Sequence, residues 1–196
     1  MKFIFSSKGL ETEIGEKLIK KAIYKYEDCL EDKKIFLFIS PYEFVAERIV
    51  TACLNMGFAR ENIYLEIPAS NVGKMNYIYI TSGNSWEILA EMRKKQATDY
   101  IRRACAENKE ITYIGASAGC LLSSFTVEEA LEFDRNYEKI EDFSGLGLHN
   151  SLILPHYNRR EKMRYLEAKP ELFEKYKHIY NVSDEDVLVL DLEELV

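Results

Sequence analysis

The segment 111–122 constrains the fold of this chain more than any other. Four β-prone residues, Ile111–Ile114, run directly into Gly-Ala-Ser-Ala-Gly, and two leucines follow in helical register. This order is typical of a nucleophile elbow, a sharp turn from strand to helix that holds a serine in a strained conformation. The small residues also have a simpler explanation, tight packing of strand against helix. The flanking strand and helix favour Ser117 as a candidate nucleophile, projecting over the end of a sheet.

Short apolar runs alternate with amphipathic segments along most of the chain, and this alternation predicts an α/β fold. We expect a mainly parallel sheet with helices on both faces, formed by residues 1–196 as a single domain. Strands are predicted at Lys2–Ser6, Lys34–Ile39, Asn62–Ile67, Asn76–Thr81, Ile111–Ile114, Ser151–Leu154 and Val187–Asp191, and helices at Glu11–Leu30, Pro41–Met56, Trp86–Arg93, Thr98–Glu107 and Arg159–His178, the last broken at Pro170.

The composition excludes several functional classes. A net charge of -7 leaves no basic surplus for phosphates, so we expect no nucleic-acid partner. No apolar run approaches the length of a membrane span, and the first residues lack the features of a signal peptide. The four cysteines show no CxxC spacing, which argues against zinc. These features together predict a cytoplasmic protein without membrane partners.

Three histidines could supply the base that a nucleophilic serine needs. His156 follows the apolar run 151–154, at the strand end where open α/β sheets collect their active sites. His149 lies in a glycine-rich turn and His178 lies late in a charged segment, and both positions favour structural roles. His156 is therefore the strongest candidate base.

An acidic side chain would orient the imidazole of such a base. Acidic residues are abundant here, and spacing alone does not select one. The candidates flank the last predicted strand: Asp184, Glu185 and Asp186 before it, and Asp191 and Glu193 at its far end.

Two backbone N–H groups are candidates for binding an oxyanion. Ala118 lies at a predicted helix N-terminus, where negative charge is stabilised. Gly83 follows the fourth predicted strand, at the same sheet edge as Ser117, and a glycine there allows close approach of a substrate. An ordinary turn before a helix capped by Ser85 explains the second segment equally well.

Four segments together resemble the peptidase E family of serine peptidases, whose best-known members are aspartyl dipeptidases. No single segment is decisive, but their order and spacing are specific and extend along nearly the whole chain. The segments are Tyr77–Ser85, similar to a strand followed by Gly-Gly-Asn-Thr; Gly115–Gly119, which matches Gly-x-Ser-Ala-Gly; Gly145–Leu148 followed by Leu154–His156; and Val182–Glu185. The chain departs from the family in Ser82, where glycine is usual, and in a short loop after the histidine.

The resemblance implies a three-layer, flavodoxin-like sandwich akin to class I glutamine amidotransferases, with serine replacing their cysteine. It implies Ser117 as nucleophile and His156 as base. It implies the Gly83 and Ala118 N–H groups as the oxyanion hole. Asp184 aligns best with the acidic third member, although aspartate is one methylene shorter than the glutamate of the aspartyl dipeptidases.

Substrate specificity is also suggested by the resemblance. In the aspartyl dipeptidases an arginine beyond the histidine receives the substrate's aspartate side chain. Arg160 could serve here, with Arg159 as an equal rival, although a solvated helix face explains both arginines as well. Asn84, in the segment similar to Gly-Gly-Asn-Thr, is a further candidate for substrate binding.

These expectations combine into a serine-type hydrolase of short peptides that acts by acyl transfer and needs no cofactor or metal. An esterase or acyl transferase acting on another small acyl substrate through the same elbow is one alternative. A catalytically silent ligand-binding protein on this scaffold is another. The order Ser, His, Asp argues against the α/β-hydrolase fold, in which the acid precedes the histidine. The oligomeric state stays open.

Overall fold

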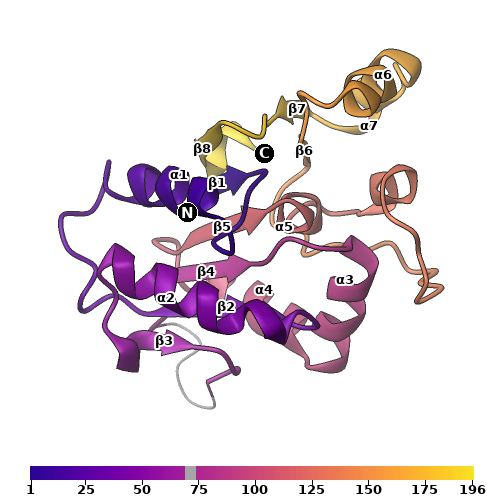
Figure 1. Cartoon of the computed structure of the whole chain (residues 1–196). Coiled ribbons are helices and arrows are strands. Elements are labelled where there is room, and N and C mark those ends of the chain that lie inside the picture. The colour runs from indigo at the N-terminus through magenta and orange to yellow at the C-terminus, as the bar shows by residue number, and fades with distance from the viewer. Residues whose placement is uncertain (69–73) are drawn as a thin grey trace.

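A computed structural model describes residues 1–68 and 74–196, and its centre is a six-stranded sheet (Figure 1). The strand order is β3-β2-β4-β5-β1-β8. All neighbours pair in parallel except β8, which runs antiparallel to β1 at one edge. The strands are β1 (Lys2–Ser6), β2 (Ile35–Phe38), β3 (Ile63–Tyr64), β4 (Tyr77–Ile80), β5 (Thr112–Ala116) and β8 (Val187–Asp191).

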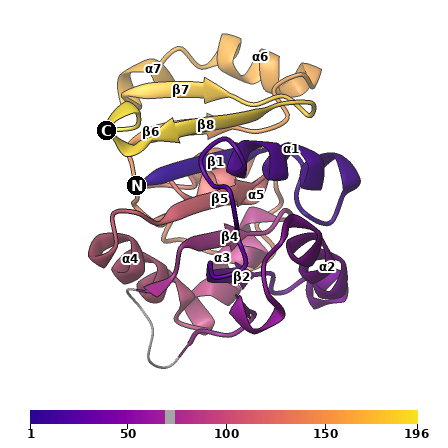
Figure 2. The ribbon, with the colours of Figure 1, turned by 90° about the vertical axis from the view of Figure 1, so that its left-hand side faces the viewer.

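Helices cover both faces of this sheet, as Figures 1 and 2 show. One face packs against α1 (Glu13–Ile23) and α2 (Ala46–Met56). The other packs against α3 (Ser85–Lys94), α4 (Ala97–Glu107) and α5 (Ala118–Leu122). The predicted three-layer α/β sandwich, with a mainly parallel sheet, is therefore confirmed.

The strands explain why two separate cores form. Side chains alternate between the two faces of a strand. In β1, for example, Phe3 and Phe5 join the core on the α3 side while Ile4 joins the core on the α1 side. All four residues of β2 and of β4 are buried, which accounts for the continuous apolar runs in the sequence.

The last third of the chain adds a second, two-stranded parallel sheet of β6 (Ser151–Leu154) and β7 (His178–Asn181). Between these strands lie α6 (Arg160–Ala168) and α7 (Leu172–Lys175), on the side of the pair away from the main sheet (Figure 2). Short 3-10 helices occupy Glu43–Val45, Arg60–Asn62, Glu128–Glu132 and Leu192–Glu194.

Several sequence-based predictions of elements were wrong. The helix predicted at Glu11–Leu30 spans only Glu13–Ile23, and the strand predicted at Asn62–Ile67 spans only Ile63–Tyr64. The segment 159–178 is not one interrupted helix, because after Pro170 only a short helix forms and His178 begins strand β7. The helix expected from Pro41 begins only at Ala46, after a 3-10 turn. Asn84, rather than Ser85, caps α3. Within the described part of the chain, no helix is long and apolar enough to cross a membrane.

Candidate active site

The turn between β5 and α5 has the geometry expected of an elbow. Ser117 has φ 48° and ψ −102°, in the left-handed half of backbone space that a serine rarely occupies. Its N–H donates to the Ser6 carbonyl at 2.8 Å, which extends the β1–β5 pairing to the turn itself. A Cβ at Gly119 would lie 2.7 Å from the Ile80 carbonyl oxygen, so a larger residue there would force α5 away from β4.

His156 follows β6 and also has a positive φ, 58°. The N–H of His156 donates to Ser7 Oγ at 2.8 Å, and Ser7 Oγ donates to the Val182 carbonyl at 2.9 Å. Ser7 directly follows β1 and is buried. This serine therefore connects the end of β1 to the two loops that follow the carboxyl ends of β6 and β7.

The side chains of Ser117, His156 and Asp184 form one line of hydrogen bonds. Ser117 Oγ lies 2.9 Å from His156 Nε2, and His156 Nδ1 is hydrogen-bonded to Asp184 Oδ1. The Asp184 carboxylate also faces two cations, with Lys8 Nζ at 3.6 Å and Arg159 Nε at 3.4 Å from Oδ2. The residues that the sequence indicated from three distant segments thus meet at one point.

The electrostatic surroundings leave the His156 imidazole able to accept a proton. Burial lowers the pKa of His156 below its ordinary value, and this outweighs the opposite effect of Asp184, so the imidazole is neutral near pH 7. Burial alone would raise the pKa of Asp184, but the hydrogen bond with His156 and the nearby cations lower it overall. A neutral imidazole between a hydroxyl and a carboxylate can take the hydroxyl proton and activate its oxygen for attack on an acyl carbon.

The two candidate oxyanion donors lie where adjacent strands end. Ala118 is the first residue of α5, so its N–H has no acceptor within the helix. Gly83 follows β4 with φ 141°, and a Cβ there would lie 2.1 Å from the ring of Tyr42. Only glycine fits both this conformation and this contact.

Asn84 has a structural task in this loop. Its side-chain oxygen accepts from the N–H groups of Trp86 and Glu87, which caps α3. Its amide nitrogen donates to the Arg135 carbonyl at 3.0 Å. Both polar ends of the side chain are therefore occupied within the protein.

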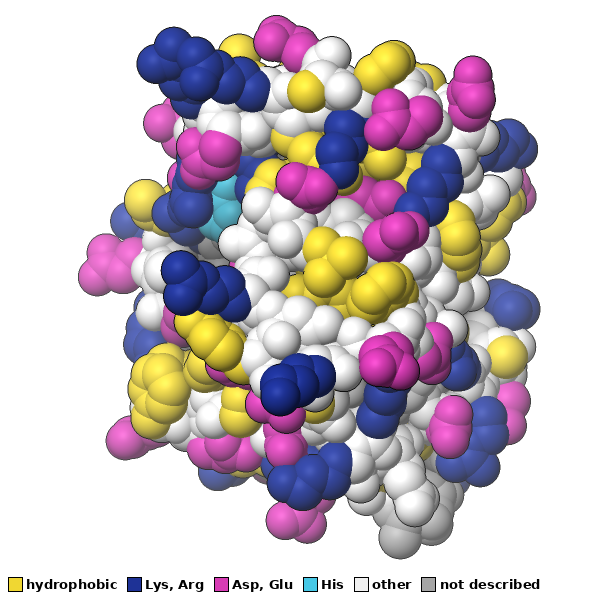
Figure 3. Space-filling view, turned by 90° about the vertical axis from the view of Figure 1, so that its right-hand side faces the viewer, with side chains coloured by type: hydrophobic (Ala, Val, Ile, Leu, Met, Phe, Trp, Pro, Cys, Tyr) yellow, Lys and Arg dark blue, Asp and Glu magenta, His cyan; other side chains and the backbone are white. Residues whose placement is uncertain are grey.

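A cavity of about 270 Å³ opens beside the serine and histidine. Its walls come from α5, the segment after the 3-10 helix 128–132, and the start of α6. It is lined by Ser85, Ser117, Ala118, Leu121, Glu132, Phe133, Asp134, Pro155, His156, Arg159, Glu161 and Lys162. Figure 3 shows one face of the molecule, where acidic and basic side chains are interspersed around apolar ones.

The two candidate arginines differ in position. Arg159 lines the cavity but pairs with Asp184. Arg160 is exposed and lies outside the cavity lining. Sequence reasoning missed Ser7, Asp134 and Lys162, which also contribute to this region. Asp134 accepts from both the N–H and the hydroxyl of Ser85.

The other acidic and histidine candidates take no part in the line of hydrogen bonds that joins Ser117, His156 and Asp184. Glu185 is exposed beside Asp184. His149 is buried against Phe3 and Phe5, and its Nε2 is 2.9 Å from Ser123 Oγ. Burial lowers the pKa of His149 to about 4, which is consistent with a neutral core residue.

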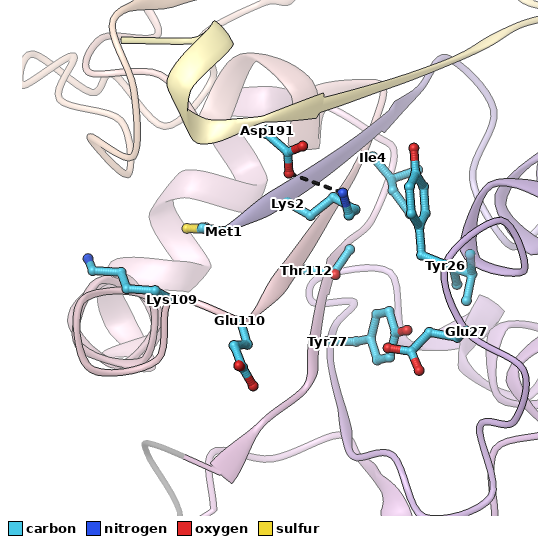
Figure 4. Close-up of a pocket in the computed structure, with 11 residues that line it drawn as sticks. Met1, Lys2, Ile4, Tyr26, Glu27, Tyr77, Lys109, Glu110, Thr112 and Asp191 are labelled. Carbon is cyan, nitrogen blue, oxygen red and sulfur yellow. Dashed lines mark hydrogen bonds and ion pairs between the residues drawn. The ribbon is translucent and has the colours of Figure 1, made fainter.

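A second pocket lies at the opposite, amino-terminal edge of the parallel strands (Figure 4). Asp191, one of the acidic candidates, pairs there with Lys2 at 3.0 Å. Tyr26 and Tyr77 line the same pocket, but neither Ser117 nor His156 does. Across the residues that the structure describes, no group of three or more His, Cys, Asp or Glu side chains could hold a metal ion.

The chain is similar in sequence to uncharacterized peptidases of two Listeria species. An uncharacterized peptidase of Listeria innocua is 22% identical over 189 residues, which cover 95% of this chain and 88% of that protein. An uncharacterized peptidase of Listeria monocytogenes is 25% identical over 128 residues, or 63% of this chain and 60% of that protein.

Solved structures show the same fold. A putative peptidase E protein from Listeria monocytogenes superposes with a TM-score of 0.64 at 19% identity, covering 97% of this chain and 98% of the other. A peptidase from an acI-B1 actinobacterium superposes with a TM-score of 0.62 at 14% identity, covering 96% and 82%. The model of peptidase family S51 matches residues 43–195, and the chain therefore belongs to peptidase family S51.

Proposed function

We propose that this protein is a serine peptidase that hydrolyses short peptides through an acyl-enzyme on Ser117. The observation that carries the proposal is the hydrogen-bonded line of Ser117, His156 and Asp184, of which Ser117 and His156 line a cavity. Membership of a peptidase family supports the reaction class. The four free cysteines suit a reducing compartment, so we assign the activity to the cytoplasm.

The reaction would proceed in two halves. In the first, Ser117 Oγ attacks the peptide carbonyl carbon while His156 takes its proton, and the N–H groups of Gly83 and Ala118 bind the oxyanion. The carbon–nitrogen bond then breaks as His156 returns the proton to the leaving amine. In the second half, His156 takes a proton from water as the water oxygen attacks the ester carbon, the bond from that carbon to Ser117 Oγ breaks, and His156 gives the proton to Oγ as the free carboxylic acid product leaves. Asp184 holds the imidazole in the required orientation throughout.

The size of the cavity supports short substrates. A volume of about 270 Å³ accommodates one or two residues rather than a folded chain. We therefore propose a dipeptidase-like activity. An N-terminal aspartate would be preferred if Arg159 turned from Asp184 to the substrate, since Arg159 lines the cavity and Arg160 does not.

Replacement of the serine tests the proposal. Ser117→Ala should fold normally, lose covalent labelling by a fluorophosphonate probe, and lose peptide hydrolysis by several orders of magnitude. His156→Ala should lose hydrolysis as well. The activity of His149→Ala and of His178→Ala should decrease only as much as their stability decreases.

The same measurements separate the alternatives. Labelling of Ser117 without turnover of any peptide in a dipeptide library would favour an esterase or acyl transferase. Absence of labelling in the native protein would favour a binding protein, and near-native hydrolysis by Ser117→Ala would overturn the assigned nucleophile.

A further inference from the structure

Lys162 is a buried cation in the wall of the same cavity. It lies in the first turn of α6, and only 6% of the residue is exposed. Its Nζ lies 2.8 Å from the centroid of the Phe133 ring. Among the residues that the structure describes, no carboxylate or carbonyl pairs with this ammonium group, although the residue lines the cavity that holds Ser117.

This placement is costly for a lysine. Burial lowers the pKa of Lys162 from its ordinary 10.5 to about 7. The first turn of a helix also disfavours a cation, because the helix dipole is positive there. A lysine that served only to hold α6 would gain more from a surface position or a paired carboxylate.

The charged groups around Lys162 do not compensate for the burial of its ammonium group. Asp134 and Glu161 raise its pKa, Arg159 lowers it, and burial outweighs all three. The buried Cys120 has its pKa raised to about 12, so it is a neutral thiol. Glu132, which also lines the cavity, pairs with Lys169, and His156 is neutral near pH 7. Asp134 already accepts from Ser85, and Arg159 already pairs with Asp184.

We infer that Lys162 is a substrate-binding residue that holds a carboxylate of the peptide in the Ser117 cavity. The inference rests on the proposed function for the identity of the ligand as a short peptide. A carboxylate would restore the charge balance of the buried ammonium, and its hydrogen bond would form out of water, where it is strong. The carboxylate has two sources in a short peptide, an acidic side chain and the free C-terminus.

Binding of this carboxylate is linked to protonation of Lys162. An anion beside the ammonium raises the pKa of the lysine, so binding above pH 7 takes up a proton. The preference for a carboxylate should therefore be greater at pH 6 than at pH 9. If an arginine bound the carboxylate instead, the preference would not change between pH 6 and pH 9, because a guanidinium keeps its charge over this range.

Four peptides bound to the inactive Ser117→Ala protein separate the two sources without any turnover. They are Asp-Leu, Asp-Leu amide, Asn-Leu and Asn-Leu amide, each titrated calorimetrically at pH 6 and pH 9. Comparing the affinities of the Asp and Asn peptides measures the contribution of the side-chain carboxylate. Comparing each free peptide with its amide measures the contribution of the C-terminal carboxylate. We expect one of these comparisons to show an advantage of about ten- to a hundredfold at pH 6.

Two methionine variants in that background test the residue. Lys162→Met should abolish the carboxylate advantage and its pH dependence. It should also raise the melting temperature near neutral pH, because it removes a buried charge. Arg164→Met removes one positive charge from an exposed position of the same helix and should leave the advantage unchanged.

The inference is overturned if Lys162→Met keeps the full advantage, if all four peptides bind equally, or if none binds. These outcomes are distinct from failure of the proposed function. If the Lys162-dependent preference is found while the native protein hydrolyses no peptide, the carboxylate site stands and only the assigned reaction is wrong.

Discussion

Ser117 and His156 both hold backbone conformations that non-glycine residues rarely adopt. Each conformation is fixed by a neighbour at the end of β1: the Ser117 N–H bonds to the Ser6 carbonyl and the His156 N–H to Ser7 Oγ. Strained residues of this kind persist only where surrounding contacts hold them. Two consecutive residues at the end of β1, Ser6 and Ser7, therefore determine how the serine and histidine face each other.

Removal of one hydroxyl tests this arrangement. Ser7→Ala, at a buried position, leaves the His156 N–H without its acceptor, and it removes one of the two donors of the Val182 carbonyl, which keeps the Tyr157 N–H. We expect a loss of about 1–3 kcal/mol in unfolding free energy and a drop of at least tenfold in kcat, with KM little changed. Ser7→Cys, which keeps a weak donor and acceptor, should recover part of the activity. An unchanged kcat for Ser7→Ala would contradict the positioning role.

The pH dependence of kcat/KM should follow the imidazole. Because the pKa of His156 is lowered from 6.5, the base stays neutral to lower pH, and activity on a peptide amide without carboxylates should fall only below that value. Asp184 raises the pKa of His156, so Asp184→Asn should shift the acid limb to still lower pH while reducing the plateau. A shift toward higher pH, or an acid limb centred above 6.5 in the native protein, would contradict this assignment.

The site residues differed in how far each could be predicted from the sequence. Ser117 and His156 could be selected because each directly follows an apolar strand, and such ends gather at one sheet edge. Asp184 required the family resemblance, because several acidic residues share its loop. Lys162 gave no signal, since it stands within a run of charged residues and burial of a charge leaves no trace in the pattern of apolar positions.

At the scale of elements, the stability of α5 comes from its contacts with neighbouring strands more than from its own length. It has five residues, all buried, and it packs closely against β4 and β5. A helix this short is unstable in isolation. Its N-terminus, and with it the Ala118 N–H, is held in place by the strands around it.

Gly119→Ala should show this dependence. The added Cβ would meet the Ile80 carbonyl oxygen and carbon in the backbone of β4, which cannot move aside easily. We expect a loss of about 3 kcal/mol and a fall in kcat, measured by denaturant unfolding and by initial rates. Gly147→Ala is the matched control, because nothing lies near its Cβ and only its φ of 68° is strained. That control should lose about 1 kcal/mol and retain its kcat. Equal losses in the two variants would contradict the contact argument.

The elements of the main sheet could be predicted because strands buried on both faces appear as apolar runs. The region after residue 158 could not, since α6, α7 and β7 lie in a highly charged sequence. Strand β7 has exposed residues at both ends, and it forms because β6 pairs with it along its whole length. Tertiary pairing of this kind is absent from any local pattern.

At the scale of the whole molecule, the two cores share the strands of one sheet. Ile19 lies in the core on the α1 side and Met92 in the core on the α3 side. We expect Ile19→Ala and Met92→Ala each to lower the unfolding free energy by about 2–5 kcal/mol while leaving one cooperative transition. Coincident unfolding curves from tyrosine and tryptophan fluorescence and circular dichroism would support a single domain. Two resolved transitions would show that the halves fold independently.

The position of β1 has a consequence for how the molecule folds. Lys2 pairs with Thr112 on one side and with Asp191 on the other, so both partners of β1 lie more than a hundred residues further along the chain. Such distant pairing slows folding, because the chain loses the entropy of closing a long loop before the contacts that stabilise the pairing can form. The residues at the end of β1 also hold the candidate site, since the Ser6 carbonyl accepts from the Ser117 N–H and Ser7 Oγ accepts from the His156 N–H. The line of Ser117, His156 and Asp184 therefore assembles only after contacts between distant parts of the sequence have formed, and a partly folded chain holds its serine without an oriented base.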